Sequence, residues 1–90
     1  MPQKLHILFY EYVPDIAERR APHREGHLAA IARWHGDDRI VMAGALGDPP
    51  HSGVLVLRDA ADAERFMAED PYVKADLVTS WRVEPWTVVT

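Results

Sequence analysis

Residues 4–12, KLHILFYEY, are the stretch that decides the fold. Nearly every position is aromatic or aliphatic, which is typical of a β-strand that is covered on both faces. Side chains alternate along a strand, so two apolar sets point in opposite directions: Leu5, Ile7 and Phe9 against Leu8, Tyr10 and Tyr12. We therefore expect helices on one face of the sheet and a second cover on the other.

The rest of the chain divides into five further elements without a linker, so residues 1–90 are predicted to form a single domain. Asp15 and Asp59 precede helical patterns and favour helix N-caps. Pro85, inside the last strand, indicates an edge position or a bulge. The expected elements are a strand at 4–12, a helix from 15 to about 35, strands at 39–46 and 54–58, a helix at 60–68 and a strand at 77–89.

This order of elements predicts an α+β fold of the ferredoxin-like βαββαβ type, a four-stranded antiparallel sheet with both helices on one face. The opposite face would then carry the apolar side chains of the first and second strands. A soluble monomer does not normally expose so large an apolar patch. We therefore expect a homodimer in which two sheets face each other as a dimeric α/β barrel.

Composition narrows the classes of function. With 90 residues, 48% hydrophobic and 27% charged, the chain is typical of a globular domain. A net charge of −4 without a basic block argues against a nucleic-acid partner. No apolar run approaches the roughly 18 residues of a membrane helix, and no signal-peptide pattern is evident, so we expect a cytoplasmic protein without a membrane partner. The absence of cysteine excludes disulfides and thiolate chemistry, and a small molecule or another protein is the expected partner.

The segment HREGH, residues 23–27, lies close to the H-E-x-x-H signature of zinc proteases. In that signature a glutamate follows the first histidine directly, and here Arg24 occupies the position. Glu25 is two residues from each histidine, about 200° around a helix, and points away from both. No third ligand stands at a familiar spacing, so we expect no metal and, without a cofactor-binding loop, no cofactor.

His27 is placed by the helical pattern at the margin of an apolar stripe. The stripe is expected to consist of Ala17, Ala21, Leu28, Ile31 and Ala32. A histidine at such a margin has two ordinary roles, as an amphipathic packing residue or as a catalytic group facing a cleft. Considered alone, packing is the commoner role.

Five segments together carry a family resemblance. ERRAPHREGHLAAI (18–31) resembles the first helix of the YciI-like family, in which a histidine and a leucine follow an arginine. Further matches are VMAGAL (41–46), SGVLVL (52–57), AEDPYVKADLV (68–78) and VEPW (83–86). The resemblance covers essentially the whole chain as a single YciI-like domain. It implies the dimeric ferredoxin-like barrel that the pattern of elements indicates independently.

By this resemblance the family's catalytic pair falls on His27 and Asp70. Asp70 precedes Pro71 and is also expected to be the N-cap of a short helix. The two roles are compatible, because one carboxylate oxygen can accept the cap bond while the other faces the imidazole. The resemblance further implies that Arg20 and Arg24 bind an anionic substrate, although a solvated helix face explains each arginine alone.

A histidine oriented by a carboxylate acts as a general base. Without a metal or cofactor its substrate must already be acidic or activated, such as a phenol or an enolisable ketone. The resemblance points to a lyase or isomerase of small cyclic compounds, including a dehydrochlorinase. Tyr72 and Ser52 are additional candidates for substrate binding. The alternative is a non-catalytic dimeric module that binds a metabolite or a protein partner, in which His27 and Asp70 only tie two segments together.

Overall fold

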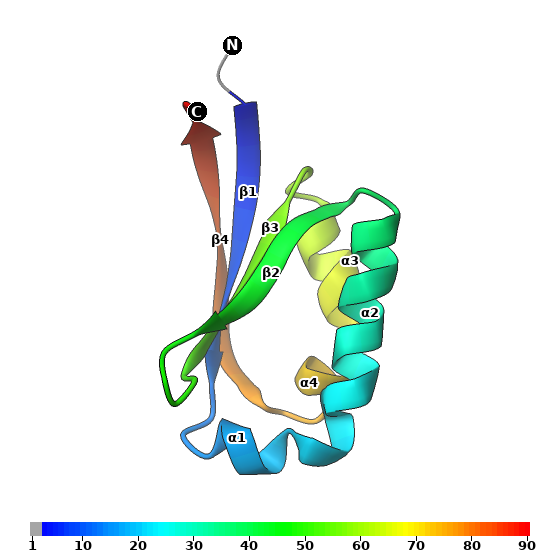
Figure 1. The fold of residues 1–90 in the computed structure, drawn as a ribbon, viewed down its shortest axis with the longest axis vertical. Helices are drawn as coiled ribbons and strands as arrows, with labels where there is room; N and C mark the ends of the chain where they lie inside the picture. Colours follow the sequence, from blue (N-terminus) through cyan, green and yellow to red (C-terminus); the bar gives the residue numbers. More distant parts are fainter. Residues whose placement is uncertain (1–2) are drawn as a thin grey trace.

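The molecule consists of a four-stranded antiparallel sheet and a layer of helices (Figure 1). A computed structural model describes residues 3–90. Its elements are β1 (Gln3–Tyr12), α1 (Ile16–Arg19), the 3₁₀ turn η1 (Ala21–His23), α2 (Arg24–Gly36), β2 (Ile40–Leu46), β3 (Ser52–Leu57), α3 (Asp62–Glu69), α4 (Pro71–Lys74) and β4 (Val78–Val88). The strand order β2-β3-β1-β4 is that of the ferredoxin-like fold, so the predicted α+β architecture is confirmed.

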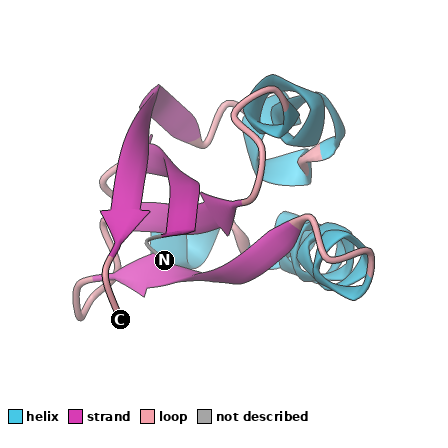
Figure 2. Ribbon diagram, turned by 90° about the horizontal axis from the view of Figure 1, so that it is seen from above, coloured by secondary structure: helices cyan, strands magenta, loops and turns pink. Residues whose placement is uncertain are grey.

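The hydrophobic core lies between the sheet and the helices. Figure 2 shows α2 and α3 on the same side of the sheet. Leu8 and Tyr10 of β1 are fully buried there, whereas Ile7 and Phe9 point to the opposite face, as the alternation of the strand predicts. The remaining buried members of this cluster are Ala30, Trp34, Ile40, Leu55, Leu57, Ala63 and Phe66.

The last strand, β4, lies at the edge of the sheet and pairs only with β1 among the described strands. Pro85 stands opposite His6 in this pair. Proline has no N–H to donate, so an edge strand can hold it without losing a ladder bond. The expected edge position is confirmed, and the irregularity in the pairing falls between Glu11 and Tyr12 rather than at the proline.

The expected single helix from 15 to about 35 is wrong, because the structure divides it into α1, η1 and α2. Pro22 lies inside the break, where it lacks an N–H and its ring would collide with the preceding turn of a continuous helix. The break also changes the buried face. α2 buries His27, Ala30 and Trp34, while Leu28 of the expected stripe is 46% exposed.

The second helical region follows the sequence pattern more closely, although Ala61 and not the expected Asp59 occupies the N-cap position of α3. Asp59 accepts a hydrogen bond from the backbone N–H of Ala61, 2.9 Å away, and thereby stabilises the turn that leads into α3. α3 ends at Glu69, and Pro71 opens the short helix α4. Proline suits the first turn of a helix, where its missing N–H would have no partner in any case. The turn between α3 and α4 therefore has a defined geometry.

The face of the sheet without helices is mainly apolar over β1, β2 and β3, and β4 places Arg82 and Glu84 opposite Phe9 and Ile7. Opposite pairs on it include Ile7 with Val56 and Phe9 with Val54. We call this surface the open face and define it by Ile7, Phe9, Met42, Val54, Val56 and Trp86. Met42 is 60% exposed and Trp86 is 41% exposed. Within residues 3–90 no helix is long and apolar enough to cross a lipid bilayer.

Candidate active site

Asp70 lies at the centre of the site, in the turn between α3 and α4. Its side chain is completely buried. The backbone of Asp70 is extended, with φ −73° and ψ 116°, as expected for a residue that precedes a proline. This conformation turns the carboxylate back towards α4, where Oδ1 accepts a hydrogen bond of 3.0 Å from the backbone N–H of Tyr72. The N-cap expected from the Asp-Pro sequence is therefore present.

His27 lies beside Asp70, although 43 positions separate the two residues in the chain. The distance from His27 Nδ1 to Asp70 Oδ1 is 2.7 Å, and the histidine is only 6% exposed. A carboxylate can only accept hydrogen bonds, so the proton of this contact belongs to Nδ1. In the neutral imidazole the other ring nitrogen, Nε2, is then the acceptor.

The two oxygens of Asp70 divide their partners differently from the expectation. Oδ1 accepts both the cap bond from Tyr72 and the bond from His27. Oδ2 accepts a hydrogen bond of 2.9 Å from the hydroxyl of Tyr10, a fully buried residue of β1. Three donors from three separate elements thus surround one carboxylate, an arrangement that suits its charged form.

Packing between α2 and α4 holds the His27 ring in place. The rings of His27 and Tyr72 stack with a centroid distance of 3.6 Å and an interplanar angle of 4°. Gly26 allows this close approach, since a Cβ at that position would lie 3.1 Å from Cγ of Pro71. A larger residue at 26 would push α2 away from the turn that carries Asp70.

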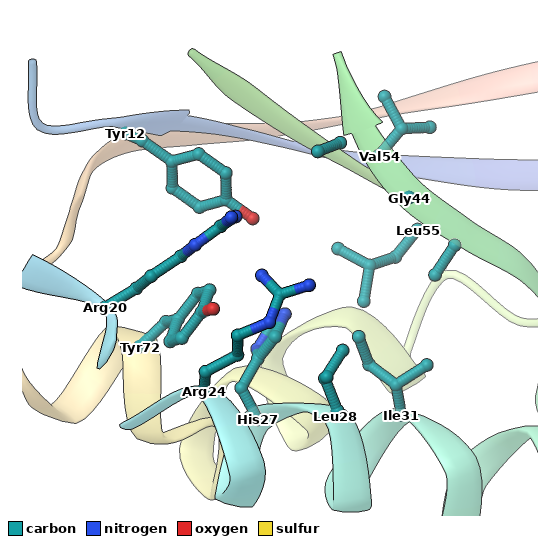
Figure 3. A pocket seen from close by; sticks show the side chains of 12 residues that line it. Tyr12, Arg20, Arg24, His27, Leu28, Ile31, Gly44, Val54, Leu55 and Tyr72 are labelled. Atoms are coloured by element: carbon teal, nitrogen blue, oxygen red, sulfur yellow. The ribbon is translucent and has the colours of Figure 1, made fainter. Parts of the chain in front are cut away.

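A cavity of about 210 Å³ opens next to His27, between α2 and the strands β2 and β3 (Figure 3). The polar side chains that line it come from Tyr12, Arg20, Arg24, His27 and Tyr72. Its apolar lining includes Leu28, Ile31, Ala43, Leu55 and the strand segment at Gly44. This combination of an apolar wall with a few convergent polar groups is typical of a small-molecule site.

The two arginines of the cavity differ from the other six arginines of the chain. The others, Arg19, Arg33, Arg39, Arg58, Arg65 and Arg82, each have a carboxylate within ion-pair distance. Arg20 and Arg24 have none among residues 3–90, and Figure 3 shows both side chains directed into the cavity. Two uncompensated guanidinium groups make this cavity positive and suited to an anion.

Burial controls the ionisation of the tyrosines around the site. Burial first, and the charge of Asp70 second, raise the pKa of Tyr10 far above its ordinary value. Tyr12 has a raised pKa for the same two reasons in the same order. Burial also raises the pKa of Tyr72, while Arg20 and Arg24 act in the opposite direction. All three phenols therefore remain hydrogen-bond donors at neutral pH.

Of the residues singled out in the sequence, Ser52 lies apart from this cavity. Its hydroxyl contacts Nδ1 of the exposed His51 at 2.8 Å at the start of β3. His23 sits at the N-terminal boundary of α2, separated from His27 by one helical turn. The part of the chain that the structure describes contains no group of three His, Cys, Asp or Glu side chains that could hold a metal ion.

Two tyrosines of β1 belong to the site although the sequence suggested only a core or interface role for them. Tyr10 binds Asp70, a residue 60 positions away, so no local spacing could reveal the contact. Tyr12 lines the cavity, and its ring packs into space that any side chain at Gly53 would occupy. Gly53 is the second residue of β3, and the sequence pattern placed it in the loop before the strand expected at 54–58, so it gave no signal of this close approach.

Comparisons with known proteins agree with the fold and extend over nearly the whole chain. The family model of the YCII-related domain matches residues 5–87. An uncharacterized protein of Haemophilus influenzae is 27% identical over 95 residues, which cover 93% of this chain and 97% of that protein.

A solved structure also resembles the fold, with a TM-score of 0.73 and 21% sequence identity over 91% of this chain and 92% of the other. It is the 5-chloro-2-hydroxyhydroquinone dehydrochlorinase of Burkholderia phenoliruptrix AC1100, in complex with 2,5-dihydroxybenzoquinone. At that identity the likeness concerns the fold alone. The family match spans well over half of the sequence and the architecture agrees with it, so this chain belongs to the YCII-related domain family.

Proposed function

We propose that the protein is a cofactor-independent lyase or isomerase in which His27 is the general base and Asp70 orients it. The observation that carries the proposal is the buried contact of 2.7 Å between His27 Nδ1 and Asp70 Oδ1, at the wall of the cavity. This contact fixes the ring and its tautomer, so that Nε2 is the nitrogen available to a substrate. A base positioned in this way contributes about 10²- to 10⁴-fold to a rate.

The cavity favours a small, negatively charged or readily ionised substrate. Its volume of about 210 Å³ suits a molecule of about one ring. Arg20 and Arg24 would bind the oxyanion of a phenolate or enolate and stabilise the negative charge that forms when the proton leaves. The dehydrochlorinase with a similar fold is named for a chlorinated hydroxyhydroquinone, which is consistent with this substrate class.

The proposed step begins with transfer of an O–H or C–H proton to Nε2 of His27. The electron pair left on the substrate then forms a new double bond. In a lyase this expels a leaving group as an anion, and in an isomerase the same proton returns at another carbon. Asp70 stabilises the imidazolium without taking the proton itself.

We further propose that the open face is covered by a second copy of the chain. Met42, 60% exposed, and Trp86, 41% exposed, lie among apolar neighbours on a face without helices. An apolar surface of this kind is typical of a homodimer interface. Two copies meeting through these faces would form the dimeric α/β barrel that the first strand predicts.

A second function is supported by one observation, the structural role of the Asp70 carboxylate. Asp70 caps α4 and bonds Tyr10 as well as His27, so the pair ties α2 and α4 to β1 whether or not it reacts. A non-catalytic module that binds a small anion or a protein partner would use the same contacts. The two functions differ in what happens when His27 is replaced.

The test compares His27→Gln with His23→Gln, the same substitution one helical turn away. Binding is measured with 2,5-dihydroxybenzoquinone, and turnover is measured as chloride release from 5-chloro-2-hydroxyhydroquinone and as deuterium uptake by cyclic enolisable ketones. We expect His27→Gln to lose about 10²- to 10⁴-fold in turnover while keeping its binding. His23→Gln should retain both.

The opposite result has an equally clear meaning. Binding of the quinone by the parent protein without turnover of any probe would favour the binding module. Turnover that survives in His27→Gln would contradict the assignment of His27 as the base. A lower midpoint of urea unfolding with unchanged turnover would show that the pair has only a structural role.

A further inference from the structure

We propose that Tyr10 is a positioning residue of this site, which acts through Asp70 to keep His27 in its neutral form with Nε2 free. Neutral His27 can accept a proton, whereas the imidazolium cannot. The catalytic meaning of this inference rests on the proposed function. The protonation state of His27, however, can be measured without any turnover.

Among residues 3–90, Tyr10 is the residue that bonds Oδ2 of Asp70. Its hydroxyl donates to Asp70 Oδ2 over 2.9 Å, while His27 and the Tyr72 backbone both use Oδ1. Tyr10 and Asp70 are fully buried, and His27 is 6% exposed. Bulk water is therefore excluded from Oδ2, and Tyr10 is the partner that satisfies it within residues 3–90.

The direction of the effect follows from charge sharing. When His27 is neutral, Asp70 carries its full negative charge and the bond from Tyr10 is strong. When His27 takes a second proton, the imidazolium neutralises much of that charge and the Tyr10 bond weakens. Tyr10 therefore stabilises the neutral state of His27 more than the charged state. Without Tyr10, the buried carboxylate would draw a proton onto the imidazole more readily.

Tyr10 can exert this influence across the working pH range. Burial first, and Asp70 second, raise the pKa of its phenol, so the hydroxyl keeps its proton. A serine or water in this place would also donate, but neither would be fixed as firmly. The Tyr10 ring is locked in the core between β1 and the helices, with Trp34 and Phe66 in the same cluster.

Other charged and titratable groups near His27 come from each element around it. Arg24 lies on the same helix, Arg20 on the preceding segment, Tyr12 on β1 and Tyr72 on α4. From β2 and β3 the cavity receives only apolar side chains such as Ala43 and Leu55. The two arginines oppose a second proton on His27 and the stacked face of Tyr72 favours it. None of these side chains donates to Asp70 Oδ2, so the contribution of Tyr10 is separable.

The experiment is an NMR titration of the ¹⁵N-labelled histidine ring in the parent, in Tyr10→Phe and in Tyr12→Phe. Tyr12 is a matched control, because it lies two residues along the same strand and its hydroxyl makes no bond to Asp70. In Tyr10→Phe we expect the second proton to bind His27 at a pH higher by about half a unit or more. The parent ring should show the tautomer with the proton on Nδ1. An unchanged or lower value, or the same shift in Tyr12→Phe, would overturn the inference.

A measurement on the unmodified protein covers the case in which Tyr10→Phe does not fold. The ¹³C shift of Tyr10 Cζ reports on the strength of its hydrogen bond, so it should change in step with the titration of His27. A Cζ resonance that stays constant through that titration would refute the coupling. Loss of the proposed function would instead appear as turnover that survives in His27→Gln, which leaves these NMR results unaffected.

Discussion

The junction of α2 and α4 differs from the open face of the sheet in how its side chains are covered. At the junction a charged side chain, Asp70, is fully buried, and its oxygens accept three hydrogen bonds. On the open face large apolar side chains such as Met42 and Trp86 remain exposed. Within residues 3–90 the polar groups of the first region have their hydrogen-bond partners, whereas the second region would be covered only in the proposed homodimer.

The most direct way to break the junction is Asp70→Ala. The substitution leaves the donors of Tyr10, His27 and the Tyr72 backbone without their acceptor in a buried site. We expect a loss of about 3 to 5 kcal/mol in the free energy of unfolding, measured by urea denaturation. Asp37→Ala, which removes an exposed partner of Arg39, should cost less than about 1 kcal/mol. Equal losses in the two variants would remove the contrast between buried and exposed carboxylates.

Alkaline pH should weaken the same region next. Tyr10 and Tyr12 have pKa values raised by burial, so above about pH 10 the unfolded chain loses phenolic protons that the folded chain retains. The unfolded state is thereby favoured, and stability falls as pH rises, by about 1.4 kcal/mol per pH unit for each tyrosine.

At neutral pH both phenols are protonated in the folded and in the unfolded state, so neither of them lowers the free energy of unfolding there. Urea denaturation between pH 9 and 11 gives the slope of the unfolding free energy against pH. Tyr10→Phe should reduce this slope by the contribution of one proton, about 1.4 kcal/mol per pH unit. A slope that is the same in Tyr10→Phe and in the parent would contradict the burial of this phenol.

A smaller effect is expected from the contact between the two helices. Gly26→Val places a side chain against Pro71, where even a Cβ would approach to 3.1 Å. Overpacking of this kind costs about 1 to 3 kcal/mol. Gly36→Val is the matched control, since a Cβ at that position would have no atom of residues 3–90 within 4 Å apart from its chain neighbours and the nearby backbone of α2. The control should change stability by less than about 1 kcal/mol, and the distance between His27 and Asp70 should grow only in Gly26→Val.

A substitution on the open face should change the oligomeric state rather than the stability of the single chain. Met42→Lys places a charge among apolar neighbours, and if a second copy covers this face the variant should sediment as a monomer where the parent sediments as a dimer. The isolated fold should change by less than about 0.5 kcal/mol. Ala29→Lys, on the exposed side of α2, should leave the sedimentation unchanged. A monomeric parent at the same concentration would contradict the proposed cover.

Patterns confined to one element predicted most of the fold. The alternation along residues 4–12 gave the two apolar faces of β1, although not which of them the helices cover, and Pro85 indicated an edge position or a bulge, of which β4 has the edge position. The continuous helix was wrong because its apolar stripe was projected through Pro22, which breaks the helix and turns the following residues onto another face. His27 consequently lies deeper than the margin that the pattern assigned to it.

Only those contacts of the site that join residues close in the sequence could be predicted from the sequence pattern. The Asp-Pro step predicts the cap at Asp70 because the donor is only two residues away. The contact with His27 came from a family resemblance, and the contact with Tyr10 came from neither source. Both contacts depend on how three elements pack together, and no periodicity within one element records that.

The positions of the three partners in the chain have a consequence for the order of folding. Residues 10, 27 and 70 must come together before the carboxylate of Asp70 can be desolvated without a large cost. The hairpin of β2 and β3 is local and can form early, whereas this meeting closes loops that span most of the chain. We therefore expect the site to form late, in the step that completes the native packing. Only a completely folded chain would then be able to bind a ligand in this cavity, because the cavity is finished in the last step of folding.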